Sequence, residues 1–168
     1  MERTLLVMRH AKSSWNSGAE SDHDRPLNGR GRRDAPIMGA HLQRHDLSPE
    51  WVLSSDSQRT RETWDGVSTE LATTPHVRFE PTLYHGGYGD LRPLLTEVPT
   101  DVQNVMALGH NPGWSYLVST LCGAHVSLTT ANVAVLRIES PDWTTAAYAE
   151  GQWELVALYR PKTLNDEP

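Results

Sequence analysis

The chain has 168 residues, a formal net charge of −6 and a hydrophobic fraction of 38%. This composition is globular and excludes an intrinsically disordered protein, and the acidic balance argues against a non-specific nucleic-acid binder. Domains typically span about 100–200 residues, so we expect a single domain over residues 1–168.

Cysteine content and hydropathy indicate the compartment. Cys122 is the only cysteine, which excludes an internal disulfide and fits a reducing environment. The apolar run at residues 5–8 is too short for a signal peptide, and no stretch approaches the ~20 residues that span a bilayer. We therefore expect a cytoplasmic protein without membrane association, either a monomer or a weak dimer.

Strand-like and helix-like segments alternate through most of the chain. The first is a continuously apolar run at residues 4–8, which is typical of a buried parallel strand. Further strands are expected at 51–53, 76–79 and 105–108. Helices are expected at 35–42, 60–71 and 90–98, and another follows the strand at 105–108 and runs to about 121. Pro36 is expected to start or kink the first helix.

The C-terminal part has a different pattern. Two strand-like runs, at 132–138 and 153–159, are separated by a polar loop and are expected to pair as antiparallel neighbours on one edge. The pattern as a whole predicts a three-layer α/β/α sandwich with a mostly parallel central sheet and an antiparallel edge near the C-terminus.

Three polar motifs lie just past predicted strand ends: Arg9-His10, the turn at 54–61, and Gly109-His110-Asn111-Pro112-Gly113. Ligands of open α/β sheets bind outside the carboxyl ends of the strands, so these motifs are expected to converge. Histidine can attack phosphorus covalently, and arginine binds phosphate oxygens in a bidentate manner.

The second and third motifs each place a polar side chain at a helix start. Arg59 falls in a first turn, where a cation is unfavourable unless it shares a bound anion with the helix end. Asn111 is expected to cap the helix that runs to about residue 121, with Pro112 at its first position. Gly109 and Gly113 are expected to leave room for a ligand beside His110.

Two other groups of residues leave alternatives open. Arg25 lies in an Asp-rich loop, where Asp22 or Asp24 could orient it toward phosphate, but an ordinary solvated loop fits equally well. His41 and His45 have metal-ligand spacing without an accompanying glutamate, so a surface helix explains them better. We expect no metal and no cofactor.

These motifs, in this order and spacing, resemble the histidine phosphatase (phosphoglycerate mutase-like) superfamily. The run from Arg9 through Asp24-Arg25-Pro26-Leu27-Asn28 to Gly31 looks like its SixA branch, whose members dephosphorylate phosphohistidine on signalling proteins. The resemblance implies that His10 is the nucleophile. It also implies further site residues, namely Arg9, Arg59 and His110 in catalysis and Arg25, Asp22 and Asn111 in substrate binding.

The resemblance implies a metal-independent phosphatase acting on phosphohistidine in a protein, or on another phosphoramidate or phosphomonoester. A mutase-type phosphotransferase, a small-molecule phosphomonoesterase and a non-catalytic phosphate-binding module remain as alternatives. The proton donor is unassigned, with Glu80, His85 and Asp90 as candidates. The expected partner is a phosphorylated substrate, with no nucleic acid.

Overall fold

A six-stranded sheet forms the centre of the molecule. The computed structural model describes residues 1–164, and its strands lie in the order β3-β2-β4-β1-β5-β6. Strands β1 to β4 are parallel, β5 is antiparallel to β1, and β6 is antiparallel to β5. This confirms the expected sheet with its antiparallel C-terminal edge. The strands are β1 (Glu2–Arg9), β2 (Trp51–Ser55), β3 (His76–Glu80), β4 (Asn104–Gly109), β5 (Val133–Glu139) and β6 (Glu154–Tyr159).

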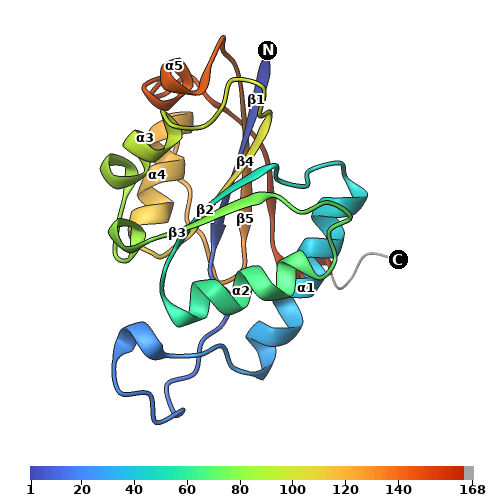
Figure 1. Cartoon of the computed structure of the whole chain (residues 1–168), viewed down its shortest axis with the longest axis vertical. Helices are drawn as coiled ribbons and strands as arrows, with labels where there is room; N and C mark the ends of the chain where they lie inside the picture. The colour runs from blue at the N-terminus through green and yellow to red at the C-terminus, as the bar shows by residue number, and fades with distance from the viewer. Residues whose placement is uncertain (165–168) are drawn as a thin grey trace.

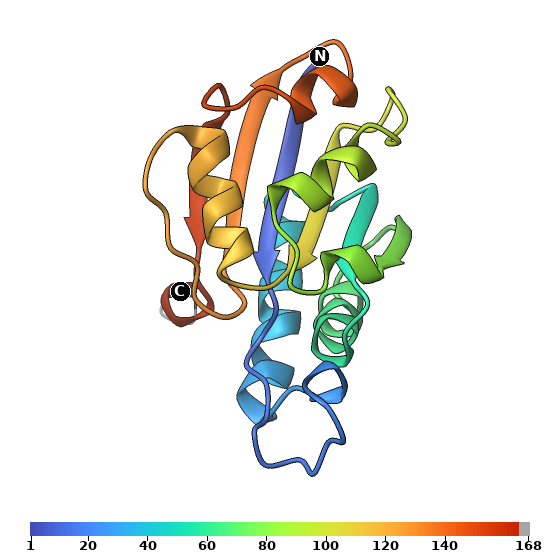
Figure 2. The ribbon, with the colours of Figure 1, turned by 90° about the vertical axis from the view of Figure 1, so that its left-hand side faces the viewer.

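Helices cover both faces of the sheet (Figures 1 and 2). One face carries α1 (Gly29–Arg44), α2 (Gln58–Ser68) and α6 (Pro161–Leu164), and the other carries α3 (Tyr88–Leu95), α4 (Gly113–Cys122) and α5 (Trp143–Ala147). Short 3-10 turns, η1 (Asp22–Asp24) and η2 (Pro81–Leu83), lie in the connecting loops. The expected three layers are therefore present.

The apolar run in β1 is explained by burial on both sides. Leu5 and Val7 pack into the core beneath α3, α4 and α5, whereas Leu6 and Met8 pack into the core beneath α1 and α2. Successive side chains of a strand point to opposite faces, so a central strand between two helical layers must be apolar throughout.

The first helix is longer than expected. It begins at Gly29, because the Asn28 side chain accepts a hydrogen bond from Gly31 N at 2.9 Å, and it continues past Pro36. The expectation that Pro36 starts or kinks this helix was therefore wrong about the start. Packing of α1 against α2 outweighs the local cost of a proline inside a helix. The two helices lie so close that a Cβ on Gly66 would be 3.1 Å from the Pro36 ring.

Two smaller expectations were also wrong. The polar loop before β6 contains α5, whose first turn is capped by the Asp142 side chain accepting from Thr145 N at 2.7 Å. His41, expected on a helix surface, is buried, with its ring centroid 4.2 Å from that of Tyr159. Both outcomes depend on tertiary packing that local patterns do not report.

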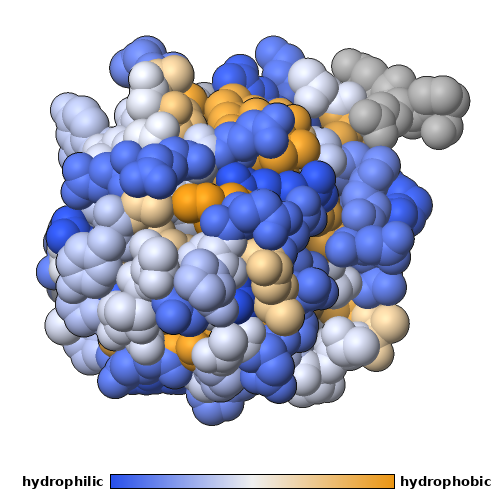
Figure 3. All heavy atoms as spheres, turned by 90° about the horizontal axis from the view of Figure 1, so that it is seen from above, coloured by the Kyte–Doolittle hydropathy of each residue, from blue (hydrophilic) through white to orange (hydrophobic). Residues whose placement is uncertain are grey.

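Figure 3 views the end of the molecule at which β1 begins, and its apolar surface is broken into patches between hydrophilic side chains. Within residues 1–164, none of the helices has the length and apolarity needed to cross a bilayer.

Candidate active site

The carboxyl ends of three strands lie side by side at one end of the sheet, at the lower side of Figure 2. His10 follows β1, Ser55 ends β2 and His110 follows β4, and these strands are neighbours in the sheet. His10 N donates a hydrogen bond to Gly109 O at 3.0 Å, and the ring centroids of His10 and His110 lie 5.1 Å apart. The structure therefore brings together two motifs that are separated by 100 positions.

His10 is held as a neutral ring with one free nitrogen. Its Nδ1 lies 2.7 Å from Ala11 O, and because a carbonyl only accepts, Nδ1 carries the proton and Nε2 keeps its lone pair. Burial lowers the His10 pKa to about 4; the Ala11 hydrogen bond opposes this shift, and the nearby Arg59 and Arg9 charges add to it. At neutral pH the ring is uncharged and can act as a nucleophile.

His110 is oriented by the end of β2. Its Nε2 lies 2.9 Å from Ser55 Oγ, which also accepts from Ser57 N at 3.3 Å. Its Nδ1 is buried and has no hydrogen-bond partner among residues 1–164. Burial is the largest cause that lowers the His110 pKa, and the nearby His10 and Arg59 add to it, so the ring is neutral at neutral pH.

The carboxylate of Asp22 links the two arginines Arg25 and Arg59. Arg59, in the first turn of α2, donates to Asp22 O at 2.7 Å and to its Oδ2 at 3.0 Å, while Arg25 donates to Oδ1 at 2.8 Å. The Tyr84 hydroxyl also donates to Oδ2. The hydrogen bond from Tyr84 and those from the two arginines hold the Asp22 pKa far below its usual range. Asp22 therefore orients guanidinium groups and is too acidic to donate a proton.

Asn111 organises the loop after β4. Its Nδ2 donates to Leu128 O at 2.7 Å, and Arg9 donates to the same carbonyl at 3.2 Å. The Asn111 Oδ1 accepts from Ser115 N at 3.2 Å and from Ser115 Oγ at 2.8 Å. Since α4 begins at Gly113, the expectation of an Asn111 cap with Pro112 as first helical residue was wrong by one position. The Asn111 side chain ties the loop together.

The two glycines beside His110, Gly109 and Gly113, are packed against other parts of the protein. A Cβ on Gly109 would meet the Trp114 indole at 2.6 Å, and one on Gly113 would meet Gly86 O at 2.0 Å. The expectation that these glycines leave space for a ligand was therefore wrong. They allow α4 and the turn at 84–87 to approach the loop closely.

Three contributing residues were not recognised in the sequence. Ser55 orients His110, Tyr84 binds Asp22, and Thr63 accepts from Ala11 N at 3.0 Å while donating to Arg59 O at 2.7 Å. The position of Thr63, four residues after Arg59 on one helix face, was a usable signal. Nothing local marks Tyr84.

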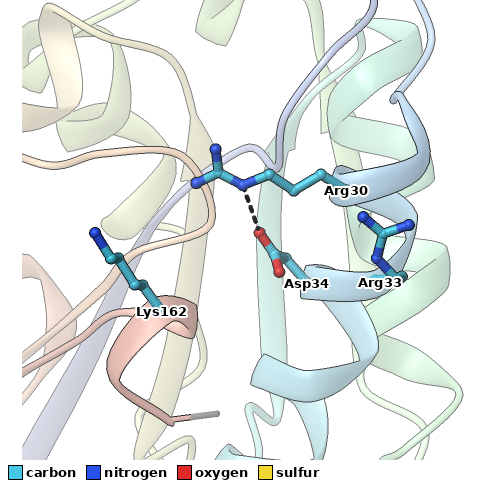
Figure 4. A pocket seen from close by; sticks show the side chains of 4 residues that line it. All are labelled: Arg30, Arg33, Asp34 and Lys162. Carbon is cyan, nitrogen blue, oxygen red and sulfur yellow. Dashed lines mark ion pairs between the residues drawn. The ribbon is translucent and has the colours of Figure 1, made fainter. Parts of the chain in front are cut away.

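Two further arginines close to Arg25 in the sequence, Arg30 and Arg33, lie around a different pocket. Arg30 and Arg33 line a pocket of about 380 Å³ with Asp34 and Lys162, and Arg30 pairs with Asp34 at 3.5 Å (Figure 4). None of the residues around His10 lines this pocket. Within residues 1–164, no three His, Cys, Asp or Glu side chains gather as metal ligands would.

The chain matches a known protein family. The model of the histidine phosphatase superfamily (branch 1) matches residues 5–116, and the chain belongs to this superfamily. A chloroplastic protein of Arabidopsis thaliana is 34% identical over 172 residues, covering 96% of this chain and 79% of that protein. A Mycobacterium tuberculosis protein is 34% identical over 127 residues, covering 76% of each chain.

Solved structures give the same result at higher coverage. The chain is similar to a structure described as a phosphohistidine phosphatase SixA of Nakamurella multipartitia, with 28% identity, a TM-score of 0.80 and 96% and 97% coverage of the two chains. It is also similar to the protein histidine phosphatase SixA complexed with tungstate, with 25% identity, a TM-score of 0.81 and 96% and 99% coverage. Family and fold together support phosphatase activity.

Proposed function

We propose that this protein hydrolyses phosphohistidine carried by another protein, through a phosphoryl group transiently bound to His10 Nε2. One observation carries the proposal: the Ala11 carbonyl holds Nδ1 protonated, which leaves the Nε2 lone pair free in a buried ring beside Arg59 and Arg9. A neutral imidazole in this setting is ready for in-line attack without prior loss of a proton.

The surroundings of His10 supply the remaining requirements of phosphoryl transfer. Charge stabilisation comes from Arg59 and Arg9, and the His110 ring lies beside that of His10, with ring centroids 5.1 Å apart. Such catalysis depends on positioning and electrostatics, so fixed guanidinium groups can replace a metal ion. The likeness to a SixA structure with bound tungstate, a tetrahedral oxyanion, supports a phosphate ligand here.

The chemistry proceeds in two steps. First, Nε2 of His10 forms a bond to phosphorus as the bond from phosphorus to the leaving nitrogen breaks. Water then attacks the phosphohistidine, the His10–phosphorus bond breaks, and inorganic phosphate and neutral His10 are released. Arg25 and Asp22 are assigned to positioning, because Arg25 donates to Asp22 and Asp22 accepts from Arg59.

The test is a rapid quench with a substrate protein phosphorylated on histidine with ³²P. The wild-type protein should carry acid-labile label on His10, and His10→Ala should lose more than about 10³-fold in turnover. His76→Ala, at the start of β3, is a matched histidine control and should behave as wild type. Efficient turnover by His10→Ala would refute the covalent route, and cleavage of small phosphomonoesters alone would favour a small-molecule phosphatase.

A further inference from the structure

The turn between η2 and α3 lies against the loop that holds His110. Gly113 and Gly86 approach so closely that a Cβ on Gly113 would lie 2.0 Å from Gly86 O and 3.3 Å from Gly87 Cα. The turn is also internally bonded, with Gly86 N donating to Leu83 O at 3.1 Å and Gly87 N donating to an Asp90 carboxylate oxygen at 2.9 Å. Any residue on this turn is therefore held in place relative to His110.

His85 is the titratable residue at the tip of that turn. Its backbone is left-handed, with φ of 57°, a conformation uncommon for residues other than glycine and often found at functional sites. Its ring centroid lies 6.0 Å from that of His110, and its Nε2 lies 3.9 Å from Asp22 Oδ2. The side chain is 64% exposed, so its ring is accessible from solvent.

The other two candidate proton donors, Glu80 and Asp90, make other interactions. Glu80 ends β3 and pairs with Arg78 at 2.7 Å. Asp90 uses its carboxylate to cap the start of α3 through Gly87 N. The Asp22 carboxylate is saturated by Arg25, Arg59 and Tyr84 and stays ionised.

We propose that His85 is the general acid of this site: its imidazolium protonates the leaving group as the bond to phosphorus breaks. The inference rests on the proposed function for the position of the phosphoryl group, but it applies to any phosphorylated substrate. His10 attacks from one end of the phosphoryl group while His85 donates its proton to the nitrogen or oxygen leaving at the other end. Neutral His85 then regains a proton from the solvent, and the attacking water becomes part of the inorganic phosphate that is released.

Charged and aromatic groups surround His85. Asp22 lies 3.9 Å from its Nε2, and the Tyr84 ring is tilted beside it with ring centroids 4.0 Å apart. Asp90, on the following helix, has one oxygen 3.2 Å from a Cβ built on Gly86, the next residue of the turn. Arg59 pairs with the same Asp22 carboxylate at 3.0 Å, and the ring centroid of His110 lies 6.0 Å from that of His85. A carboxylate therefore stands beside an exposed imidazole.

The experiment compares two aryl phosphates that differ only in their need for a proton. 4-Nitrophenolate leaves as a stable anion, whereas the phenolate of phenyl phosphate requires protonation. His85→Asn is suited to the test, because asparagine accepts a left-handed backbone and the turn should keep its shape. Its kcat for phenyl phosphate should fall by about 10²-fold or more, while its kcat for 4-nitrophenyl phosphate should stay within about threefold of wild type.

Two further readouts separate acid catalysis from a structural role. The wild type should lose phenyl phosphate activity at alkaline pH, and His85→Asn should lack this alkaline decline. His85→Gly, which also tolerates the turn, should reproduce both effects, and His76→Asn should show neither. Equal losses on the two substrates, or no loss on phenyl phosphate, would overturn the proposal. Retained 4-nitrophenyl phosphate turnover shows that the phosphatase site is intact, so this result is independent of whether phosphohistidine is the substrate.

Discussion

At the scale of single residues, the protonation of His10 is the most informative feature. Its neutral state arises from burial, and the Ala11 hydrogen bond determines which nitrogen is free. An unperturbed histidine would be about half protonated at pH 6.5, and a protonated ring has no free lone pair with which to attack. Because burial keeps His10 neutral, nearly all molecules retain this lone pair in mildly acidic solution.

The first prediction concerns this titration. The His10 ring should titrate near pH 4 in the folded protein, well below the ~6.5 of a model histidine. The measurement is a pH series of histidine ring NMR signals, with His10→Asn used to assign the His10 signal. A midpoint above about pH 6 would contradict the neutral nucleophile.

The same shift affects stability. Below pH 6.5 the unfolded chain binds a proton at His10 that the folded protein does not bind until about pH 4, so stability is lost as pH falls through this interval. The contribution is on the order of 3 kcal/mol at most, and His10→Asn should therefore lose less stability than wild type between pH 6.5 and 4. Urea unfolding at a series of pH values measures the difference.

At the scale of elements, the contact between the turn at 84–87 and the start of α4 joins two parts of the site. Tyr84 on this turn binds Asp22, and Gly86 packs against Gly113. The position of the turn therefore affects both the arginine pair and His85. Close approach of two backbones is possible here because neither glycine carries a side chain.

The second prediction tests this contact. Gly113→Ala would place its Cβ 2.0 Å from Gly86 O, so the turn must move, and we expect a loss of about 1–3 kcal/mol in stability. Turnover of phenyl phosphate should fall more than turnover of 4-nitrophenyl phosphate, because His85 moves with the turn. Thermal unfolding and the two kinetic assays measure these effects.

Gly89→Ala is the matched control. Gly89 lies in α3, is exposed, and a Cβ there would meet nothing within 4 Å. Alanine favours a helix over glycine by about 0.5–1 kcal/mol, so this variant should keep full activity and gain slightly in stability. If both variants behave alike, the contact between Gly113 and Gly86 has no role in the site.

At the scale of the whole molecule, the layered fold explains why positive charge gathers at one edge of an acidic protein. The net charge is −6, but Arg9, Arg25 and Arg59 all lie near His10, and their charges lower its pKa. The end of β1, the start of α2 after β2, and the loop that holds Arg25 bring these side chains to the same end of the sheet. The local positive charge at this site is therefore independent of the sign of the overall charge.

The third prediction follows from this local charge. Activity toward 4-nitrophenyl phosphate should be unchanged in excess EDTA, because arginines supply the positive charge, and tungstate should inhibit competitively. Tungstate at 100 times its Kd should also stabilise the folded protein by about 2.7 kcal/mol, which a thermal shift assay detects. If EDTA stops turnover and a divalent ion restores it, charge stabilisation by arginines alone is insufficient.

Much of this architecture could be predicted from local sequence patterns. The doubly buried run in β1, the strand ends at His10 and His110, and the antiparallel C-terminal pair follow from hydropathy and turn residues that lie close together in sequence. Periodicity reports which faces are buried, and burial on both faces is what defines a central strand. The order of the layers could therefore be predicted without coordinates.

Only the tertiary structure decided the contacts between distant segments. The pairing of Asp22 with Arg59, the packing of Gly86 against Gly113, and the position of His85 beside His110 join residues 25 to 37 positions apart. The structure also decided that Gly109 and Gly113 accommodate protein atoms, and that His41 is buried. A sequence pattern carries information about a residue's neighbours along the chain, whereas these roles depend on distances that exist only once the sheet and its two helical layers have assembled.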